Sequence, residues 1–262
     1  MQDYHIHSDY STDSEQKLLG ICEKAVEQNL SEIAVTDHID IDYPYDLHFA
    51  FDFDARSAEM DAVQKNFPSL AIKKGVEIGI TAETKKDYVN IINAHPFDFV
   101  IASVHVLDGI DPYYPEFFVG KTKEQAYTAY LQAIDDGMRD FDDYDVIGHI
   151  GYASRFYPGE NRQIHYADYA DILDSILKRA VQSGKGIEVN TKGIETTGDT
   201  LPNESILKRY RELGGEILTL GSDAHSADRV GDAVWETAEK LKEMGFRYYT
   251  SFTRRKATQV KL

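Results

Sequence analysis

Residues 32–38 read E-I-A-V-T-D-H, and this short stretch contains both parts of the pattern that decides the fold. Residues 32–36 have the length and the apolar centre of a buried β-strand. Asp37 and His38 follow at once and carry side chains that can bind a metal ion. The same combination recurs along the chain, so the spacing of the apolar runs indicates the architecture and the residues after them indicate the chemistry.

Runs with the composition of strands alternate with segments whose apolar residues have helical spacing. About eight runs are predicted to be strands on this pattern: one just before His5 and residues 32–36, 71–78, 97–103, 145–148, 186–190, 216–220 and 248–252. The clearest helical stripes are Leu18, Leu19, Cys22 and Val26, and Ile172, Leu173, Ile176, Leu177 and Val181 before a helix end at Ser183-Gly184. Such alternation over about 250 residues predicts a parallel α/β fold, and the length favours a closed (β/α) barrel over an open doubly wound sheet. No linker interrupts it, so we expect residues 1–262 to form a single barrel domain.

The composition excludes several classes of function. Asp and Glu number 45 against 28 Lys and Arg, a formal net charge of −17, which disfavours nucleic acid and anionic membranes as partners. The N-terminal residues lack the pattern of a signal peptide and no apolar run is long enough to span a membrane, so we expect a cytoplasmic protein. Cys22 is the single cysteine and is expected in the core, which leaves histidines and carboxylates as the metal ligands.

Residues 39–53 (IDIDYPYDLHFAFDF) follow a predicted strand and are rich in Asp and aromatic residues. The segment is long for a connection in a barrel. It is interpreted either as a loop that faces the substrate or as a surface excursion packed by its own tyrosines.

Residues that can bind metal follow six of the predicted strands. They are His5 and His7, Asp37 and His38, Glu77, His105, His149, and Asp223 and His225. In a parallel barrel these strand ends open onto one face, so the side chains would converge. A single histidine at a strand end is weak evidence, but coincidence at six ends is improbable. His48, His95 and His165 lie away from strand ends and are left out of the site.

The number of candidate ligands indicates the kind of site. Imidazoles and carboxylates suit zinc, iron or manganese. About eight ligands exceed what one ion takes, so two or three divalent ions are expected. A close cluster of this kind suits hydrolysis of a phosphate ester, because it activates water and neutralises phosphoryl oxygens.

The motifs around these residues resemble those of the PHP (polymerase and histidinol phosphatase) family. They are D-Y-H-I-H-S at 3–8, T-D-H at 36–38, G-V-E at 75–77, S-V-H at 103–105, G-H-I at 148–150 and G-S-D-A-H at 221–225. The resemblance implies a distorted (β/α)7 barrel with a trinuclear metal centre at the C-terminal ends of the strands. One of the predicted strands must then lie outside the barrel.

Transferred position by position, the resemblance implies three groups of ligands. The first is His5, His7, Glu77 and Asp223, the second is Glu77, His105 and His149, and the third is Asp13, His38 and His225. Asp13 stands where other members have histidine, and its harder carboxylate favours iron or manganese in the third site. Asp3 and Asp37 are expected to orient neighbouring imidazoles.

Length and the segments G-I-E-V-N-T at 186–191 and G-S-D-A-H make the chain most similar to the stand-alone histidinol-phosphate phosphatases of that family. The resemblance implies a phosphomonoesterase that converts L-histidinol phosphate to L-histidinol and phosphate in histidine biosynthesis, by attack of a metal-bridging hydroxide. Gly151 and Glu195 depart from residues common in those enzymes, so a nucleotide or another phosphate ester remains the alternative substrate. An inactive metal-binding protein would lack a ligand, and none is missing.

The remaining candidates concern catalysis and the substrate, which is expected to be a small phosphate monoester. Glu77, Asp223 and Arg155 are the expected catalytic residues. Arg155, which follows His149 by six residues, is the best cation for the phosphate because its planar guanidinium matches phosphate geometry. Lys192 and Arg229 are further candidates for phosphate contacts, and Glu116 is the candidate partner of the substrate amine or imidazole.

Overall fold

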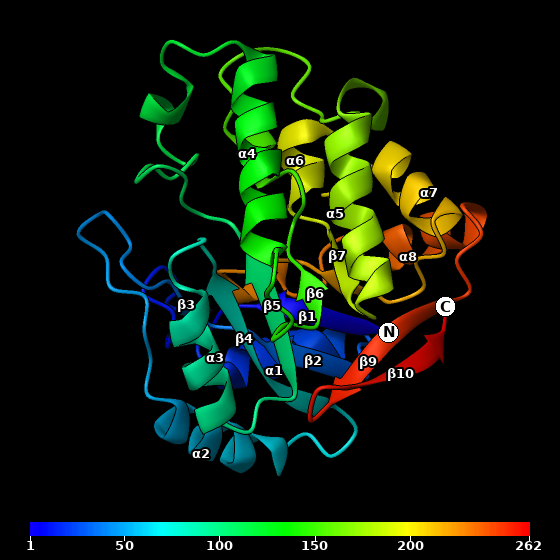
Figure 1. Ribbon diagram of the computed structural model, residues 1–262. Helices are drawn as coiled ribbons and strands as arrows, with labels where there is room; N and C mark the ends of the chain where they lie inside the picture. The colour runs from blue at the N-terminus through cyan, green and yellow to red at the C-terminus, as the bar shows by residue number, and fades with distance from the viewer.

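A computed structural model describes residues 1–262 and has a parallel sheet at its centre with helices around it (Figure 1). The sheet runs in the order β1-β2-β4-β5-β6-β7-β8, and the short β3 pairs with β4. Its strands are β1 (Gln2–Ile6), β2 (Glu32–Val35), β3 (His38–Ile39), β4 (Ala71–Gly79), β5 (Phe99–Ser103), β6 (Val146–Ile147), β7 (Gly186–Asn190) and β8 (Leu218–Gly221). Seven of the eight predicted runs therefore contain a strand of this sheet, and the short β3 was not predicted.

The two ends of this sheet meet. Ile6, at the end of β1, bridges Ala224, which follows β8, and the amide of His7 donates to the carbonyl of Ala224 at 3.0 Å. The register between β1 and β2 shifts between Asp3 and Ile6, and β6 is only two residues long. The sheet is thus nearly closed into a distorted barrel, which confirms the predicted architecture.

Three of the α-helices begin at residues whose side chains accept hydrogen bonds from free backbone N–H groups. The eight α-helices are α1 (Leu18–Glu27), α2 (Phe53–Gln64), α3 (Lys85–Ala94), α4 (Lys123–Met138), α5 (Ala170–Gln182), α6 (Gly193–Thr197), α7 (Glu204–Glu212) and α8 (Val234–Glu243), and the 3₁₀ helices are η1 (Pro115–Phe118), η2 (Tyr152–Arg155), η3 (Tyr166–Asp168) and η4 (Ala227–Arg229). Asp52, Thr122 and Asn203 accept hydrogen bonds from the first turns of α2, α4 and α7. Each helix is too short or too polar to span a bilayer.

The predicted helical stripes are confirmed in part. In α5, Leu173, Ile176 and Leu177 are buried, and the helix ends at Ser183 as expected. In α1 the buried side chains are Leu18, Ile21, Cys22 and Ala25, whereas Leu19 and Val26 are 46% and 43% exposed. The stripe of α1 is therefore shifted around the helix from the predicted one.

The strand that lies outside the barrel is the last predicted one. β9 (Tyr248–Thr253) pairs antiparallel with β10 (Lys256–Lys261), a strand that was not predicted. Phe252 of this hairpin packs against Tyr4 and Phe99 in a small apolar cluster. Since Phe99 is the first residue of β5, the hairpin covers the N-terminal end of that strand and leaves the C-terminal ends free to form a site.

Candidate metal centre

A pocket of about 440 Å³ lies at the C-terminal ends of the parallel strands. Most of the predicted site residues line it, namely Asp13, His38, Glu77, His105, His149, Arg155, Lys192, Asp223 and His225. His5 and His7 lie directly beneath, fully buried. The structure thus brings together all nine predicted metal ligands from six strand ends and the loop before α1.

Glu77, at the centre of this group, is fully buried and faces imidazoles with both carboxylate oxygens. Its Oε2 lies 2.9 Å from Nε2 of His5, 3.5 Å from Nε2 of His7 and 3.2 Å from Nδ1 of His38. Parallel pairing of β3 and β4 places His38 directly opposite Glu77, which explains the last contact.

The other oxygen of Glu77 serves a second group. Oε1 lies 2.8 Å from Nε2 of His149 and 3.3 Å from Nε2 of His105, and it accepts a hydrogen bond from Oγ of Ser103 at 2.5 Å. Because each oxygen faces a different set of nitrogens, this carboxylate has the arrangement of a bridge between two metal positions.

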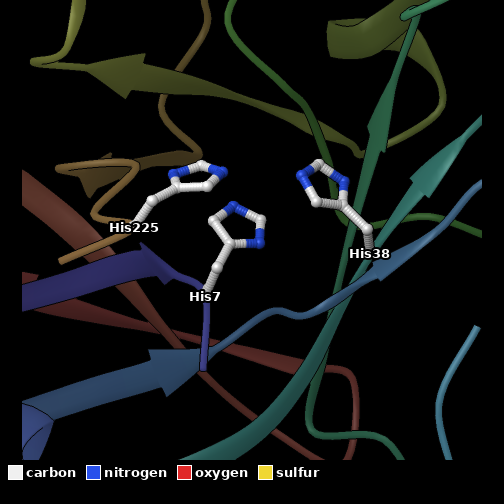
Figure 2. Close-up of side chains that lie close together, drawn as sticks. All are labelled: His7, His38 and His225. Atoms are coloured by element: carbon white, nitrogen blue, oxygen red, sulfur yellow. The ribbon is translucent and has the colours of Figure 1, made fainter. Parts of the chain in front are cut away.

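Three histidines lie close together in a further group. Figure 2 shows His7, His38 and His225 with their rings gathered from three separate segments. The ring centroids of His7 and His38, and of His7 and His225, are each 4.2 Å apart. Asp13 Oδ2 lies 3.0 Å from Nε2 of His225 and 3.6 Å from Nε2 of His38. Asp223 also contacts this group: its Oδ1 lies 3.4 Å from Nδ1 of His225 and 3.6 Å from Nε2 of His7.

Unpaired nitrogens show that these residues fit metal ions. Nε2 of His7 and Nδ1 of His38 are buried and have no hydrogen-bond partner, although carboxylate oxygens lie 3.2–3.6 Å away. A buried polar atom without a partner is costly, and a cation between nitrogen and oxygen would remove that cost. The groups whose ligand atoms lie within 4.8 Å of one another are His7-His38-His225, His5-Glu77-His149, His5-His7-Asp223 and His38-Glu77-His105.

Burial and the neighbouring imidazoles determine the protonation states of Glu77 and His7. Burial opposes ionisation of Glu77, yet the surrounding imidazoles of His5, His38 and His105 hold its pKa well below the usual range. Burial and the neighbouring imidazoles of His38 and His225 keep the pKa of His7 well below its ordinary value. His7 is therefore neutral, which is the form that binds a metal.

Two acids that the sequence analysis missed hold the imidazoles in place. Glu188 of β7 lies with Oε1 2.5 Å from Nδ1 of His5, and its Oε2 accepts the backbone N–H of His149 at 2.7 Å. Asp40 lies with Oδ1 3.0 Å from Nδ1 of His105. Partners of this kind fix the orientation of metal-binding imidazoles. The one sequence signal for Glu188 was a charged residue inside a strand that is otherwise apolar.

Asp3 and Asp37 do not orient imidazoles, and the prediction that they do was wrong. Asp3 accepts hydrogen bonds from the backbone N–H and the hydroxyl of Ser222, at 2.9 and 2.5 Å. Asp37 accepts the backbone N–H of Ser8 at 2.6 Å and pairs with the buried Arg56 at 2.9 Å. Both acids therefore fix the loops that carry ligands, and neither accepts a hydrogen bond from an imidazole.

Two of the predicted cations lie in the pocket. Arg155 has Nη1 3.3 Å from Oδ2 of Asp223, and its guanidinium lies over the rings of Phe156 and Tyr152 at 5.1 and 5.6 Å from their centroids. Lys192 donates from Nζ to the backbone oxygen of Asp223 at 3.3 Å. Both positive charges thus border the proposed metal ligands.

The other two predicted substrate contacts do not reach the pocket. Arg229 pairs with Glu195 and Asp232, each at 3.0 Å, so its charge is already matched at the surface. Glu116 is exposed in η1 and does not line the pocket. The acids that line it besides the expected ligands are Asp40 and Asp111.

The long segment after β3 faces the pocket, which favours the first of its two interpretations. Tyr43, Leu47 and Phe49 line the cavity. Phe49 lies against His38 with ring centroids 5.2 Å apart, and the Asp40 amide donates to the Phe49 carbonyl at 3.1 Å.

Comparison with known proteins agrees with this geometry. The sequence pattern of the PHP domain matches residues 3–192. The chain belongs to the PHP domain family. Within that family it is 33% identical to a histidinol-phosphatase of Lactococcus lactis, over 96% of this chain and 94% of that protein. It is also 33% identical to a probable histidinol-phosphatase of Clostridium acetobutylicum, over 87% of this chain and 88% of that protein.

A solved structure of a PHP relative matches the whole fold. The histidinol phosphate phosphatase of Lactococcus lactis, crystallised with zinc, L-histidinol and phosphate, superposes with a TM-score of 0.92 at 33% identity. The match covers 98% of each chain. The fold described above is therefore shared with this phosphatase over nearly the whole chain.

Proposed function

We propose that this PHP-domain protein is a metal-dependent phosphomonoesterase that hydrolyses L-histidinol phosphate to L-histidinol and phosphate, a step of histidine biosynthesis. The observation that carries the proposal is Glu77, whose two oxygens face separate sets of imidazoles at the base of a pocket that also contains Arg155. The similarity to histidinol-phosphatases over nearly the whole chain supports the choice of substrate. From the sequence we further propose that the protein is cytoplasmic and does not bind nucleic acid.

The contacts support three metal positions with the ligands that the family resemblance implies. His5, His7, Glu77 and Asp223 would hold one ion, Glu77, His105 and His149 a second, and Asp13, His38 and His225 a third. Zinc, iron or manganese ions there would supply an activated water and positive charge for the phosphoryl oxygens. Glu188 and Asp40 would keep the rings of His5 and His105 in the orientation that this requires.

Arg155 and Lys192 are proposed to bind the phosphoryl group. The planar guanidinium of Arg155 can donate two parallel hydrogen bonds to phosphoryl oxygens. Its contact with Asp223 and its position over two aromatic rings direct it toward the metal ligands before substrate arrives. This prior orientation lowers the entropy lost when phosphate binds.

The organic part of the substrate would lie toward the mouth of the pocket. Asp40 and Asp111 bring negative charge to this cavity, and aromatic side chains from three loops line it. L-Histidinol carries an amine and an imidazole, so a pocket with acids and flat rings complements it better than a pocket lined by cations would.

The test is phosphate release by protein reconstituted with zinc or manganese. L-Histidinol phosphate is compared with a nucleoside monophosphate, glycerol 2-phosphate and a phosphodiester, each with and without chelator. We expect the highest kcat/KM for L-histidinol phosphate, and no phosphate release from any ester after chelation. Good turnover of other monoesters without turnover of this one would overturn the substrate assignment, and no turnover of any ester would overturn the activity.

A further inference from the structure

The carboxylate of Asp111 joins three segments that are far apart in the sequence. Its Oδ2 accepts a hydrogen bond from the hydroxyl of Tyr43 at 2.7 Å. Its Oδ1 accepts from the hydroxyl of Tyr152 at 3.1 Å and from the backbone N–H of Tyr113 at 2.7 Å. Asp111 is only 3% exposed, so these bonds are shielded from water.

The three segments are the connections that follow β3, β5 and β6, and their rings form one continuous surface. We call this surface the aromatic wall; it consists of Tyr43, Phe49, Tyr113, Tyr114, Tyr152 and Phe156, all of which line the pocket. Ring contacts also join the three connections: the centroids of Tyr45, on the connection after β3, and Tyr114 are 3.9 Å apart, and those of Tyr113 and Phe156 are 5.3 Å apart.

The aromatic wall also touches the metal centre. The ring of Tyr152 lies 5.1 Å from that of His149 and 5.5 Å from that of His105, measured between centroids. On the other side, Phe49 lies 5.2 Å from His38. A group bonded to a phosphate held between these histidines and Arg155 would therefore lie against the wall.

We infer that Asp111 is a positioning residue that fastens the three loops of the aromatic wall, and that the wall selects phosphate esters by the shape of their alcohol part. The inference rests on the proposed phosphomonoesterase function and extends it to substrate selection. No role for Asp111 followed from the sequence, because its partners come from loops 41 and 68 residues away.

Positioning is favoured over direct contact with substrate because both oxygens of Asp111 already accept hydrogen bonds. A carboxylate has about four acceptor positions, and three donors fill most of them. The two tyrosine hydroxyls donate to this carboxylate, which leaves it little capacity for a further donor from the substrate.

The experiment measures kcat and KM of the metal-reconstituted enzyme for two substrates, L-histidinol phosphate and glycerol 2-phosphate, which has no ring. Tyr43→Phe and Tyr152→Phe each remove one hydroxyl and keep the ring, and Asp111→Ala removes the acceptor. Tyr166→Phe is the matched control, because it deletes a Tyr–Asp hydrogen bond of 3.1 Å, to Asp174, outside the pocket. Metal content is measured for every variant.

We expect Asp111→Ala to lower kcat/KM for L-histidinol phosphate about tenfold, mainly through KM, the size expected for loss of a hydrogen bond to a charged group. The kcat/KM for glycerol 2-phosphate should change less than about twofold, since its small acyclic alcohol part has no ring to pack against the wall. Tyr43→Phe should have little further effect once Asp111 is alanine, because the two act through one bond. Tyr166→Phe should behave as wild type.

Three results would overturn the inference. One is an equal loss for both substrates, which a general structural defect would give. Another is an effect of Asp111→Asn while Tyr43→Phe and Tyr152→Phe together leave KM unchanged, which would mean that the carboxylate binds the substrate cation directly. The third is an unchanged kcat/KM for both substrates in every variant. If Asp111→Ala does not fold, the two tyrosine variants alone decide. Failure of wild type on L-histidinol phosphate would instead refute the proposed function.

Discussion

Glu188 lies with Oε1 2.5 Å from Nδ1 of His5, and both side chains are fully buried inside the barrel. The opposite nitrogen of the same ring, Nε2, lies 2.9 Å from Glu77. His5 is thus held between an acid that fixes its orientation and an acid that shares its proposed metal position. The buried charge of Glu188 is thus paired with the ring of His5, and its other oxygen accepts the backbone N–H of His149.

Glu188→Gln should therefore weaken the metal centre. The amide keeps the shape but removes the charge that makes the imidazole of His5 a stronger ligand, and loss of such a partner costs about 10–100-fold in metal affinity or activity. Metal content and kcat/KM check this. Glu195→Gln is the matched control, since Glu195 pairs only with Arg229 at the surface. Equal behaviour of both variants would show that Glu188 has no role in the site.

Arg155→Ala should mainly impair binding of phosphate. One charge-assisted contact contributes about 1.5–3 kcal/mol, so kcat/KM should fall roughly 10–150-fold and inhibition by inorganic phosphate should weaken in step. Metal content should stay near that of wild type. Arg229→Ala, which removes an arginine outside the pocket, should keep nearly full activity. If both variants lose activity to the same degree, the assignment of Arg155 fails.

Asp13 should affect which metal occupies the third proposed position, the one it shares with His38 and His225. Its Oδ2 lies 3.0 Å from His225 and 3.6 Å from His38, and a carboxylate is a harder ligand than an imidazole. Asp13→His should raise the ratio of zinc to manganese after reconstitution with both metals at equal concentration. An unchanged ratio would place Asp13 outside the coordination of any ion.

The buried pair of Arg56 and Asp37 should contribute more to stability than to chemistry. Both side chains are fully buried, and Nη1 lies 2.9 Å from Oδ2. Removing one partner leaves an unpaired buried charge, so Asp37→Ala should lower the free energy of unfolding by about 3–5 kcal/mol. Lys208→Ala breaks an exposed pair with Glu204 and should cost less than about 1 kcal/mol. Chemical denaturation compares the two, and similar midpoints would contradict this account.

The sequence predicted which histidines and carboxylates lie together, because strand ends of a parallel barrel converge whatever lies between them. His5, Glu77 and His149 lie together although 72 residues separate each neighbouring pair, since β1, β4 and β6 open onto the same face. The same reasoning could not predict β10, because a hairpin outside the barrel leaves no such regularity.

The sequence could not predict which loop side chains line the pocket, because their positions depend on partners from other loops. Glu116 and Asp111 lie on one connection, yet only Asp111 turns inward, where hydroxyls of Tyr43 and Tyr152 meet it. Arg229 was predicted to contact substrate, but in the structure it pairs with Glu195 at 3.0 Å. Spacing along the chain contains no information about such pairs.

The central claim is that Glu77 and the surrounding imidazoles hold a cluster of metal ions. The most direct test is elemental mass spectrometry of the protein, reconstituted with zinc or manganese and then dialysed. The account predicts at least two tightly bound ions per chain, and fewer after His149→Ala. Fewer than two ions per chain in the wild-type protein would contradict it.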